Sequence, residues 1–409
     1  MSLYTGVGQS NNTHEERAGA EACLNARTTL RTSTNIEPKL AIIFASSHYD
    51  QQTLLSTIRG TLPTSCLLIG SSTAGEITNE GSGHHSVTVM LMTADDGVQF
   101  FVGKGTDIKN VGPFTAGADF ANNLLSQASA AETTLKSVVM FPDVLSGNGS
   151  DTVRGALSVL GENFPLVGGA SGDNQEFKVT YQYIGDEVLS GTVVGFGLSG
   201  ELAFGVGVRH GWVPIGMPMV VTKSTESTIE EIDGKPALNV YETYFGKKNS
   251  DLLKGSSSVA STKSVLTYPF GISEPGHEEI LIRFATNVGE NGSITCAAEI
   301  PEGSDIRLMI GSKERAIEAA RTAASMAMSN LSGKKPSGAI IFNCIARNNL
   351  FGEEASHEIQ AIQEVIGKET PLIGFYTYGE QAPVNGTTKN IEKCETSFHN
   401  ETVVIYLFA

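Results

Sequence analysis

Residues 40–76 read LAIIFASSHYDQQTLLSTIRGTLPTSCLLIGSSTAGE. An apolar strand (residues 40–44) is followed by a helical segment near residues 50–59 and by a second strand (66–69), which ends in a Gly-Ser-Ser-Thr corner. A wholly apolar strand is typical of a sheet covered on both faces. Two strands joined through a helix are expected to be parallel, with a right-handed crossover. This segment therefore predicts an α/β fold.

The same order of elements occurs three times. The first strand corresponds to SVVMF (residues 137–141) and to GAIIF (338–342), and a Gly-containing corner follows 26, 27 and 32 residues after the closing Phe. Internal repeats indicate repeated structural units, so we expect each copy to form helix, strand, helix, strand and hairpin. In the first copy we expect residues 87–92 to pair with 98–102. Because hairpins add antiparallel strands, the sheets are expected to be mixed.

The repeats also suggest a domain division. Residues 1–220 hold two copies, and residues 221–409 hold a β-rich insert, at about 220–310, and the third copy. We therefore expect a two-lobed α/β (α+β) protein with mixed β-sheets flanked by helices, and a boundary near residue 220. Within the insert we expect a Ser-rich loop at residues 255–261 and a strand at 264–268.

Composition excludes several classes of function. Lys and Arg number 28 against 44 Asp and Glu, which gives a net charge of −16, so a nucleic-acid partner is not expected. The N-terminus has no apolar targeting segment and no run is long enough to span a membrane, so we expect a cytoplasmic protein without a membrane partner. The five cysteines form no Cys-x-x-Cys pair, and nucleotide loops and metal motifs are absent, so no cofactor and no metal is expected.

The three corners are the first candidate site. Ligands of open α/β sheets bind beyond the carboxyl ends of the strands, and each corner lies there, with glycines that allow close approach and polar side chains that bind. The alternative is that the fold simply needs a tight turn three times. The candidate corner residues are Gly70, Ser72, Thr73, Glu76, Ser171, Asp173, Gly374, Tyr376, Thr377, Gly379 and Glu380.

Two further candidates follow the third apolar strand. Arg347 is suited to bind a carboxylate or phosphate in a bidentate manner; an equally weighted alternative is a salt bridge, for example to Glu380 or Glu353. Cys344 would need a cation or a histidine nearby to act as a nucleophile, and no histidine spacing indicates one. A buried, unreactive Cys344 is the alternative.

Several segments together resemble the FIST family. Residues 40–77 are similar to its N-terminal part, and IDGKPALNVYETYFG (232–246), GAIIFNCIARNNLFG (338–352) and PLIGFYTYGEQAP (371–383) are similar to its C-terminal part. The resemblance implies FIST N-terminal and C-terminal domains and a sensory, small-molecule-binding role in prokaryotic signal transduction, with related domains in eukaryotic ubiquitin signalling. Amino acids are the favoured ligand class.

The resemblance covers nearly the whole chain and leaves no segment for a kinase, methyl-accepting, cyclase or F-box output domain. It therefore implies a stand-alone type that acts through a separate signalling protein, such as a kinase or a chemoreceptor. The alternatives are a small-molecule enzyme that uses Cys344 and an interaction scaffold without a small ligand.

For an amino-acid ligand, we expect Arg347 to bind the carboxylate, helped by the backbone N–H of Gly374 or Gly70. Tyr376 and Tyr378 are expected to line a side-chain slot. The partners expected for the ammonium group are Glu76, Asp173 and Glu380.

Overall fold

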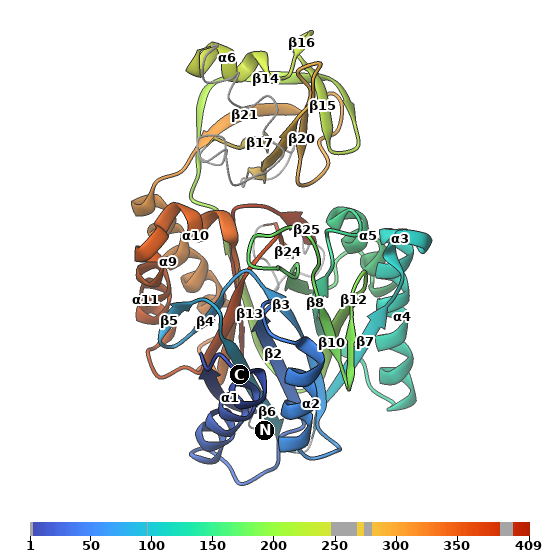
Figure 1. Cartoon of the computed structure of the whole chain (residues 1–409), viewed down its shortest axis with the longest axis vertical. Coiled ribbons are helices and arrows are strands. Elements are labelled where there is room, and N and C mark those ends of the chain that lie inside the picture. Colours follow the sequence, from blue (N-terminus) through green and yellow to red (C-terminus); the bar gives the residue numbers. More distant parts are fainter. Residues whose placement is uncertain (1–2, 96, 247–267, 274–279, 385–395) are drawn as a thin grey trace. The chain divides into compact units, whose positions relative to one another are not determined.

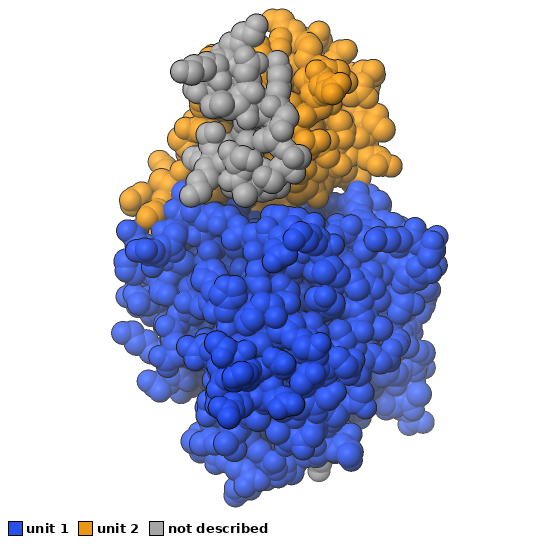
Figure 2. Space-filling model, viewed as in Figure 1, with its two compact units in different colours: residues 1–209, 319–398, 402–409 blue, residues 210–318, 399–401 orange. Residues whose placement is uncertain are grey.

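The structure is a computed structural model, and it describes residues 3–95, 97–246, 268–273, 280–384 and 396–409. It confirms a mixed α/β fold (Figure 1). The chain forms two compact units (Figure 2), which consist of Met1–Arg209, Ala319–Phe398 and Thr402–Ala409, and of His210–Glu318 and His399–Glu401. The expected Ser-rich loop and nearly all of the strand expected at 264–268 lie outside the described residues.

Three copies of one element order build the first unit. The first copy contains β1 (Leu3–Ser10), α1 (Glu15–Arg31), β2 (Leu40–Ser46), α2 (Gln51–Thr61), β3 (Leu67–Thr73), β4 (Glu76–Thr78), β5 (Gly81–Gly83) and β6 (Val87–Ala94). The second contains β7 (Val98–Gly105), α3 (Ile108–Val111), α4 (Pro113–Ala130), β8 (Leu135–Pro142), α5 (Gly149–Leu160), β9 (Leu166–Gly169), β10 (Gln182–Ile184), β11 (Glu187–Leu189) and β12 (Val193–Gly200). The third contains β13 (Phe204–Arg209), α9 (Lys313–Asn330), β22 (Gly338–Cys344), α10 (Ile345–Phe351), the short 3₁₀ turn η2 (Gly352–Glu354), α11 (Ala355–Ile366), β23 (Leu372–Thr377), β24 (Glu380–Pro383), β25 (Thr396–His399) and β26 (Val403–Phe408).

In each copy, the hairpin that follows the parallel strand pair joins the sheet of another copy. The three strand orders are β1-β6-β2-β3-β10-β11, β7-β12-β8-β9-β24-β25 and β13-β26-β22-β23-β4-β5. Equivalent strands thus hold equivalent places, and only the last two strands of each sheet come from elsewhere. The predicted parallel pairs are present as β2–β3, β8–β9 and β22–β23.

The hairpin predicted from residues 87–92 and 98–102 is wrong. β6 pairs with β1 and β2, whereas β7 pairs with β12 in the next sheet. The reason is that β7 is the first strand of the second copy, equivalent to β1 and β13. Each of these strands carries a Gly-x-Gly that lets its helix approach: a Cβ on Gly8 would lie 2.2 Å from the Ala22 carbonyl oxygen of α1. Gly105 and Gly207 meet α4 and α9 in the same way.

One hydrophobic core joins the three sheets. It contains the Phe that closes the first apolar strand of every copy. The rings of Phe44 and Phe141 are 5.5 Å apart, and those of Phe141 and Phe342 are 6.2 Å apart. Helices α1 and α2 cover the other face of the first sheet, where they form a separate apolar cluster with β2. The three copies therefore fold around shared apolar side chains.

The second unit is built mainly from antiparallel strands. Its elements are β14 (Val213–Thr225), β15 (Thr228–Ile232), β16 (Lys235–Pro236), α6 (Asn239–Phe245), β17 (Phe270–Ser273), β18 (Leu281–Arg283), β19 (Ala285–Val288), β20 (Ile294–Cys296) and β21 (Asp305–Ile310). These compact units do not follow the division at residue 220, because hairpin exchange ties the third copy to the first two. Among the helices of the described chain, none has both the length and the apolar composition that crossing a membrane requires.

Candidate functional site

The three predicted corners meet and bond to one another. The Tyr376 N–H donates to the Gly75 carbonyl oxygen (2.8 Å), and the Tyr376 carbonyl accepts from the Ala74 N–H (3.1 Å). Equivalent bonds complete a ring of three corners; they join Ala170 to Tyr378 and Gly379, and Ser72 to Gly172 and Tyr181. The three corners thus lie together, and the contacts between them are largely backbone contacts.

In two of the corners, the residue that begins the exchanged hairpin is a buried glutamate. Glu76 Oε1 is bonded to the Thr73 hydroxyl, and Glu76 Oε2 accepts from the N–H (3.0 Å) and the hydroxyl (2.7 Å) of Ser86. The third copy repeats this arrangement with Thr377, Glu380 and Thr402. Burial raises the pKa of Glu76 and of Glu380 to about 7, although hydrogen bonds to both groups act in the opposite direction.

The second copy replaces this carboxyl group by an amide. Gln182 begins the exchanged hairpin of that copy, as Glu76 does in the first. Its Nε2 donates to the Ser171 hydroxyl (3.0 Å), and its Oε1 accepts from the Thr192 hydroxyl (3.0 Å). Ser171 is thus the counterpart of Thr73. In all three corners, a buried carboxyl or amide group lies between two hydroxyl groups.

Arg347 lies fully buried in an ion pair. Its Nε donates to Glu358 Oε1 (2.9 Å), its Nη2 binds the same oxygen, and Asn343 Nδ2 donates to Glu358 Oε2 (2.8 Å). The salt-bridge alternative is therefore what the structure shows. The partner of Arg347 is Glu358 and not Glu380 or Glu353, the two partners expected from the sequence.

The other predicted residues are also enclosed. Tyr378 donates to Asp173, whose carboxylate also accepts three backbone N–H groups of the second corner. Tyr376 is fully buried, and burial raises its pKa to about 12. Cys344 is buried at the end of β22, where its N–H donates to the Thr402 carbonyl. The glycines Gly70 and Gly374 pack closely against Ile43 and Ile341 of the neighbouring strand, and Gly379 packs against the ring of Phe398.

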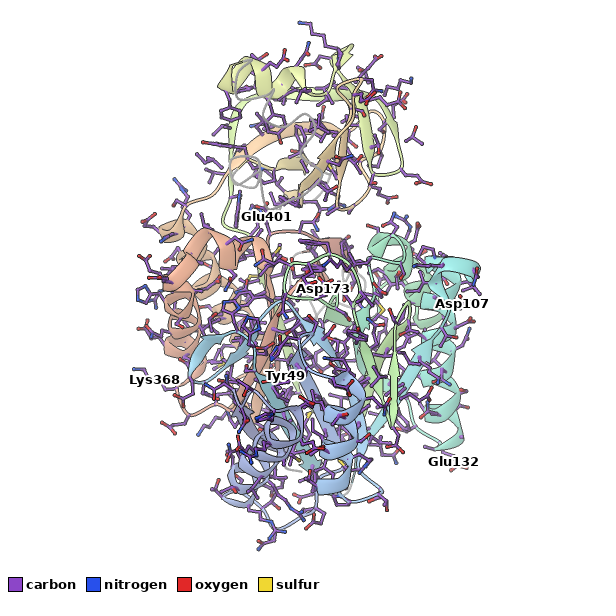
Figure 3. The ribbon with its side chains drawn as sticks, viewed as in Figure 1. Tyr49, Asp107, Glu132, Asp173, Lys368 and Glu401 are labelled. Atoms are coloured by element: carbon purple, nitrogen blue, oxygen red, sulfur yellow. The ribbon has the colours of Figure 1, made fainter. Side chains whose placement is uncertain are left out.

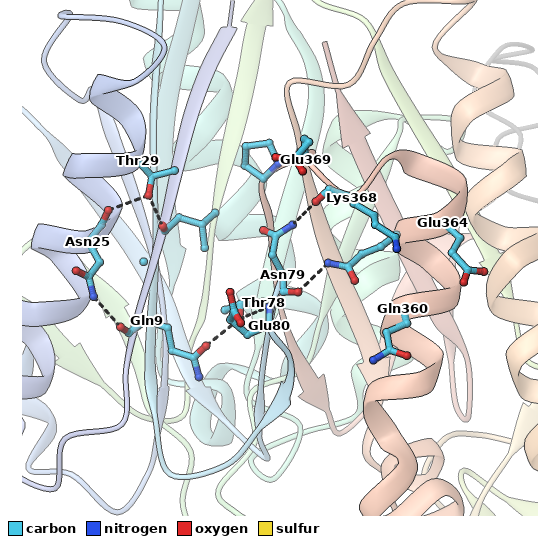
Figure 4. A pocket seen from close by; sticks show the side chains of 14 residues that line it. Gln9, Asn25, Thr29, Thr78, Asn79, Glu80, Gln360, Glu364, Lys368 and Glu369 are labelled. Carbon is cyan, nitrogen blue, oxygen red and sulfur yellow. Dashed lines mark hydrogen bonds between the residues drawn. The ribbon is translucent and has the colours of Figure 1, made fainter.

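An open cleft lies in another part of the first unit. Its volume is about 760 Å³, and it is lined by β1, α1, the β4–β5 turn, α11 and the loop before β23. In Figure 4, Asn25 and Thr29 are on one side, Gln360 and Glu364 are on the other, and Asn79 lies between them. None of the predicted site residues lines this cleft. Asp173 and Lys368, which mark the corners and the cleft, are well separated in Figure 3.

Most of the residues that line the cleft have polar side chains. The edge carbonyls of β1 are bound by α1: Asn25 donates to the Gln9 carbonyl (3.1 Å) and Thr29 to the Val7 carbonyl (3.1 Å). On the opposite wall, Gln363 donates to the Asn79 carbonyl (2.9 Å). The charged residues of the lining are Glu80, Glu364, Lys368 and Glu369. Sequence reasoning missed all of these residues, which come from four separate segments and form no motif.

No metal site accompanies these features in the part of the chain that the structure describes. Those residues contain no group of three or more His, Cys, Asp or Glu suited to hold a metal ion. His48 and His85 are neighbours, with their Nδ1 atoms 3.3 Å apart, but they form a pair only. The side chains that line the cleft can bind a ligand by charge and hydrogen bonds.

Comparisons with known proteins confirm the resemblance to the FIST family. Residues 39–235 match the model of the FIST N domain, and residues 237–383 match that of the FIST C domain. An uncharacterized protein of Mycobacterium tuberculosis is 26% identical over 395 residues, which cover 94% of this chain and 96% of that protein. An uncharacterized protein of Methanocaldococcus jannaschii is 28% identical over 166 residues, 39% of this chain and 32% of that protein.

Solved structures offer only distant similarity. A cyanuric acid hydrolase from A. caulinodans aligns with a TM-score of 0.39 and 9% identity, and covers 100% of this chain and 99% of its own. A phosphoribosylformylglycinamidine synthase II from Thermotoga maritima aligns with a TM-score of 0.22 and 7% identity, over 99% of this chain and 72% of its own. Similarity at this level carries no argument about function.

Proposed function

We propose, on the premise that this chain belongs to the FIST family, that it is a sensory protein of prokaryotic signal transduction whose ligand is an amino acid or a similar small carboxylate. Domains of this family are generally sensory, ligand-binding domains in signalling. The observation that carries the proposal for this chain is the open polar cleft of about 760 Å³, a volume within the usual range of about 300–1,000 Å³ for small-molecule sites.

The lining suits a zwitterion. Lys368 is exposed and, among the described residues, takes part in no ion pair, so its ammonium group is available to a ligand carboxylate. Glu80 and Glu369 offer carboxylates to a ligand ammonium group, and amide side chains such as Gln9 and Gln360 both donate and accept. The cleft thus presents both charges that an amino acid needs.

The position of the cleft suits a sensor. Val7 and Thr29 precede the FIST N match, Thr78–Glu80 lies within it, and residues 360–371 belong to the FIST C match. A ligand held there contacts both family domains at once, so binding favours one arrangement of their junction. We propose that a separate signalling protein, such as a kinase or a chemoreceptor, reads this change.

The corner site predicted from sequence remains a second location for the ligand. A ligand at Arg347 would have to displace Glu358, and one at Glu380 would have to displace the hydroxyls of Thr377 and Thr402. Breaking buried ion pairs and hydrogen bonds carries a large penalty. The structure therefore favours the cleft over the corners as the place where the ligand binds.

Thermal-shift measurements on the full chain against the common amino acids test the proposal. A ligand that binds the folded state raises Tm through mass action, by an amount that grows with ligand concentration. We expect at least one amino acid to do so, and we expect Lys368→Gln to reduce that shift. The matched control is Lys104→Gln, which removes a lysine outside the cleft. If no amino acid raises Tm of the parent chain, the proposed function is wrong.

A further inference from the structure

The cleft has an equivalent elsewhere in the first unit, where an ion pair joins the edge strand to the exchanged hairpin. The edge strand β7 faces the exchanged hairpin β10–β11 as β1 faces β4–β5, since the strand orders correspond. Between β7 and β11 the Lys104 ammonium lies 2.7 Å from a Glu187 carboxylate oxygen. An ion pair therefore occupies the joint between the second and first copies.

The corresponding residues at the cleft carry no charge. Aligning Gly103-Lys104-Gly105 with Gly6-Val7-Gly8 places Val7 opposite Lys104, and the hairpin register places Gly81 opposite Glu187. Gly81 has φ +113°, and a Cβ there would lie 2.6 Å from the Ser356 hydroxyl oxygen, so a side chain at this position is strained and crowded. Neither position at the cleft therefore carries a charged side chain, and no ion pair equivalent to Lys104–Glu187 forms there.

Carboxylates outnumber ammonium groups around this space. The lining contains three glutamates and one lysine. Glu364 is paired with Arg321, at 2.5 Å, which leaves Glu80 and Glu369 to face one Lys368. A ligand with one carboxylate and one ammonium would leave a carboxylate of the lining without a partner. A ligand with a second cationic group satisfies all three charges. The net charge of −16 also raises the local concentration of cations.

Polar side chains make up most of the lining. Val7, Gly8 and Pro371 are the only residues without a polar side chain among those lining the cleft, and no aromatic ring is present. Amide groups both donate and accept hydrogen bonds, so they can bind a polar ligand side chain of either kind. The excess of carboxylates is therefore what favours a cationic side chain.

We propose that the cleft selects amino acids with a cationic side chain, with the α-carboxylate on Lys368 and the two cationic groups on Glu80 and Glu369. This inference rests on the proposed function and narrows its ligand. The side-chain cation then lies near Val7, the position that corresponds to Lys104 in the other joint. No bond is made or broken, and the ligand leaves unchanged.

Isothermal titration calorimetry on the full chain tests the selection with L-lysine, L-ornithine, L-arginine, L-leucine, L-glutamate and cadaverine as probes. We expect the three basic amino acids to bind at least about tenfold more tightly than L-leucine or L-glutamate, and cadaverine, which lacks the carboxylate, to bind more weakly than L-lysine. If leucine or glutamate binds as well as lysine, the inference is wrong while the proposed function stands. If no amino acid binds, both fail.

Variants then locate the site. Glu80→Gln and Glu369→Gln should each weaken binding of L-lysine by at least about tenfold, whereas Asp186→Asn, at the position equivalent to Glu80 in the other joint, should leave it unchanged. Val7→Lys places an ammonium group in the cleft, as Lys104 does in its joint, and should abolish binding. Because Val7 packs against the core, binding is measured at a temperature where this variant is folded. Unchanged affinity in Val7→Lys and Glu80→Gln would show that basic amino acids bind elsewhere and would overturn the assignment.

Discussion

Gln182 occupies in the second copy the position that Glu76 occupies in the first. Each begins an exchanged hairpin, and each side chain lies between a corner hydroxyl and the hydroxyl of the residue before the repeat's last strand. A glutamine and a protonated glutamate both present one donor and one acceptor end. The copies therefore share a site built for a neutral group, which agrees with the raised pKa of Glu76 and Glu380.

This relationship predicts how stability depends on pH. The pKa of Glu76 is about 7 in the folded protein against its ordinary value of 4.5, so the folded state binds the proton more tightly than the unfolded chain. The free energy of unfolding should then be greatest below pH 4.5 for this group and fall as pH rises to about 7, by up to about 3 kcal/mol. Glu76→Gln should remove that dependence, so that urea unfolding at pH 8 shows a variant more stable than the parent.

The reverse substitution is the matched control. Gln182→Glu should add a third titrating group, lower stability at pH 8 and leave it nearly unchanged at pH 5, because the added carboxyl is neutral only at the lower pH. If Glu76→Gln and the parent show the same slope of stability against pH, the carboxyl group is ionised in the folded protein and the argument is wrong.

The buried pair of Arg347 and Glu358 predicts a large loss of stability when one partner is removed. Arg347→Met leaves the Glu358 carboxylate buried without its guanidinium, and we expect the free energy of unfolding to fall by about 3–5 kcal/mol. The double variant Arg347→Met/Glu358→Leu should recover a substantial part of that loss, as measured by urea unfolding. A single-variant loss below about 1 kcal/mol would contradict burial of the pair.

The same variant tests the role predicted for Arg347 from sequence. Affinity for a cognate amino acid can be measured at a temperature where Arg347→Met is still folded. The cleft lies apart from Arg347, so we expect unchanged affinity. A loss of about tenfold or more would instead support the corner as the binding site.

Much of the fold follows from local pattern. The apolar runs at residues 40–44, 137–141 and 338–342 became the central strands β2, β8 and β22, because a short apolar run that is flanked by helices has no other stable place than a covered sheet. These strands depend on residues close in sequence, which is why they could be predicted. The contacts between the three corners, in contrast, join segments far apart in sequence.

The sheet that each exchanged hairpin joins could not be predicted in the same way. Residues 76–83 form a hairpin whose pattern does not say which sheet it joins, and it pairs with β23, almost 300 residues away. Of the first strands of the three copies, β1 was missed because Gly-x-Gly is a poor strand signal. The strand expected at residues 98–102 is present as part of β7, but its partner is β12. The cleft is made at such a joint, so its residues could not be found without the exchange.

The Gly-x-Gly strands predict a sharp difference between two glycine substitutions. Gly8→Ala places a Cβ 2.2 Å from the Ala22 carbonyl oxygen, so α1 must move away from β1, and we expect the free energy of unfolding to fall by about 3 kcal/mol or more. Gly60→Ala in α2 meets nothing within 4 Å and should raise stability by about 0.5–1 kcal/mol, because alanine favours the helix. Chemical denaturation of both variants measures the contrast. Equal effects would mean that α1 does not approach β1 so closely.

Hairpin exchange also predicts which part of the chain folds alone. In the first copy four residues connect β1 to α1, whereas in the third copy the connection from β13 to α9 contains nearly all of the second unit. Replacing residues 210–312 by Gly-Ser-Gly-Ser gives the third copy a connection as short as that of the first. Because all three sheets and their exchanged hairpins remain, we expect this variant to unfold in one cooperative thermal transition with retained far-UV circular dichroism.

The matched comparison is the fragment of residues 1–220, which keeps two whole copies. It lacks β24, which pairs with β9, so the second sheet loses its exchanged hairpin. It also lacks β26, β22 and β23, so the third sheet loses its central strands and part of the shared core is exposed. We expect the fragment to show no cooperative transition and to bind hydrophobic dyes. If the fragment unfolds cooperatively and the variant without the second unit does not, the copies fold as the linear halves divided at residue 220 and the exchanged hairpins are not needed for the stability of the first unit.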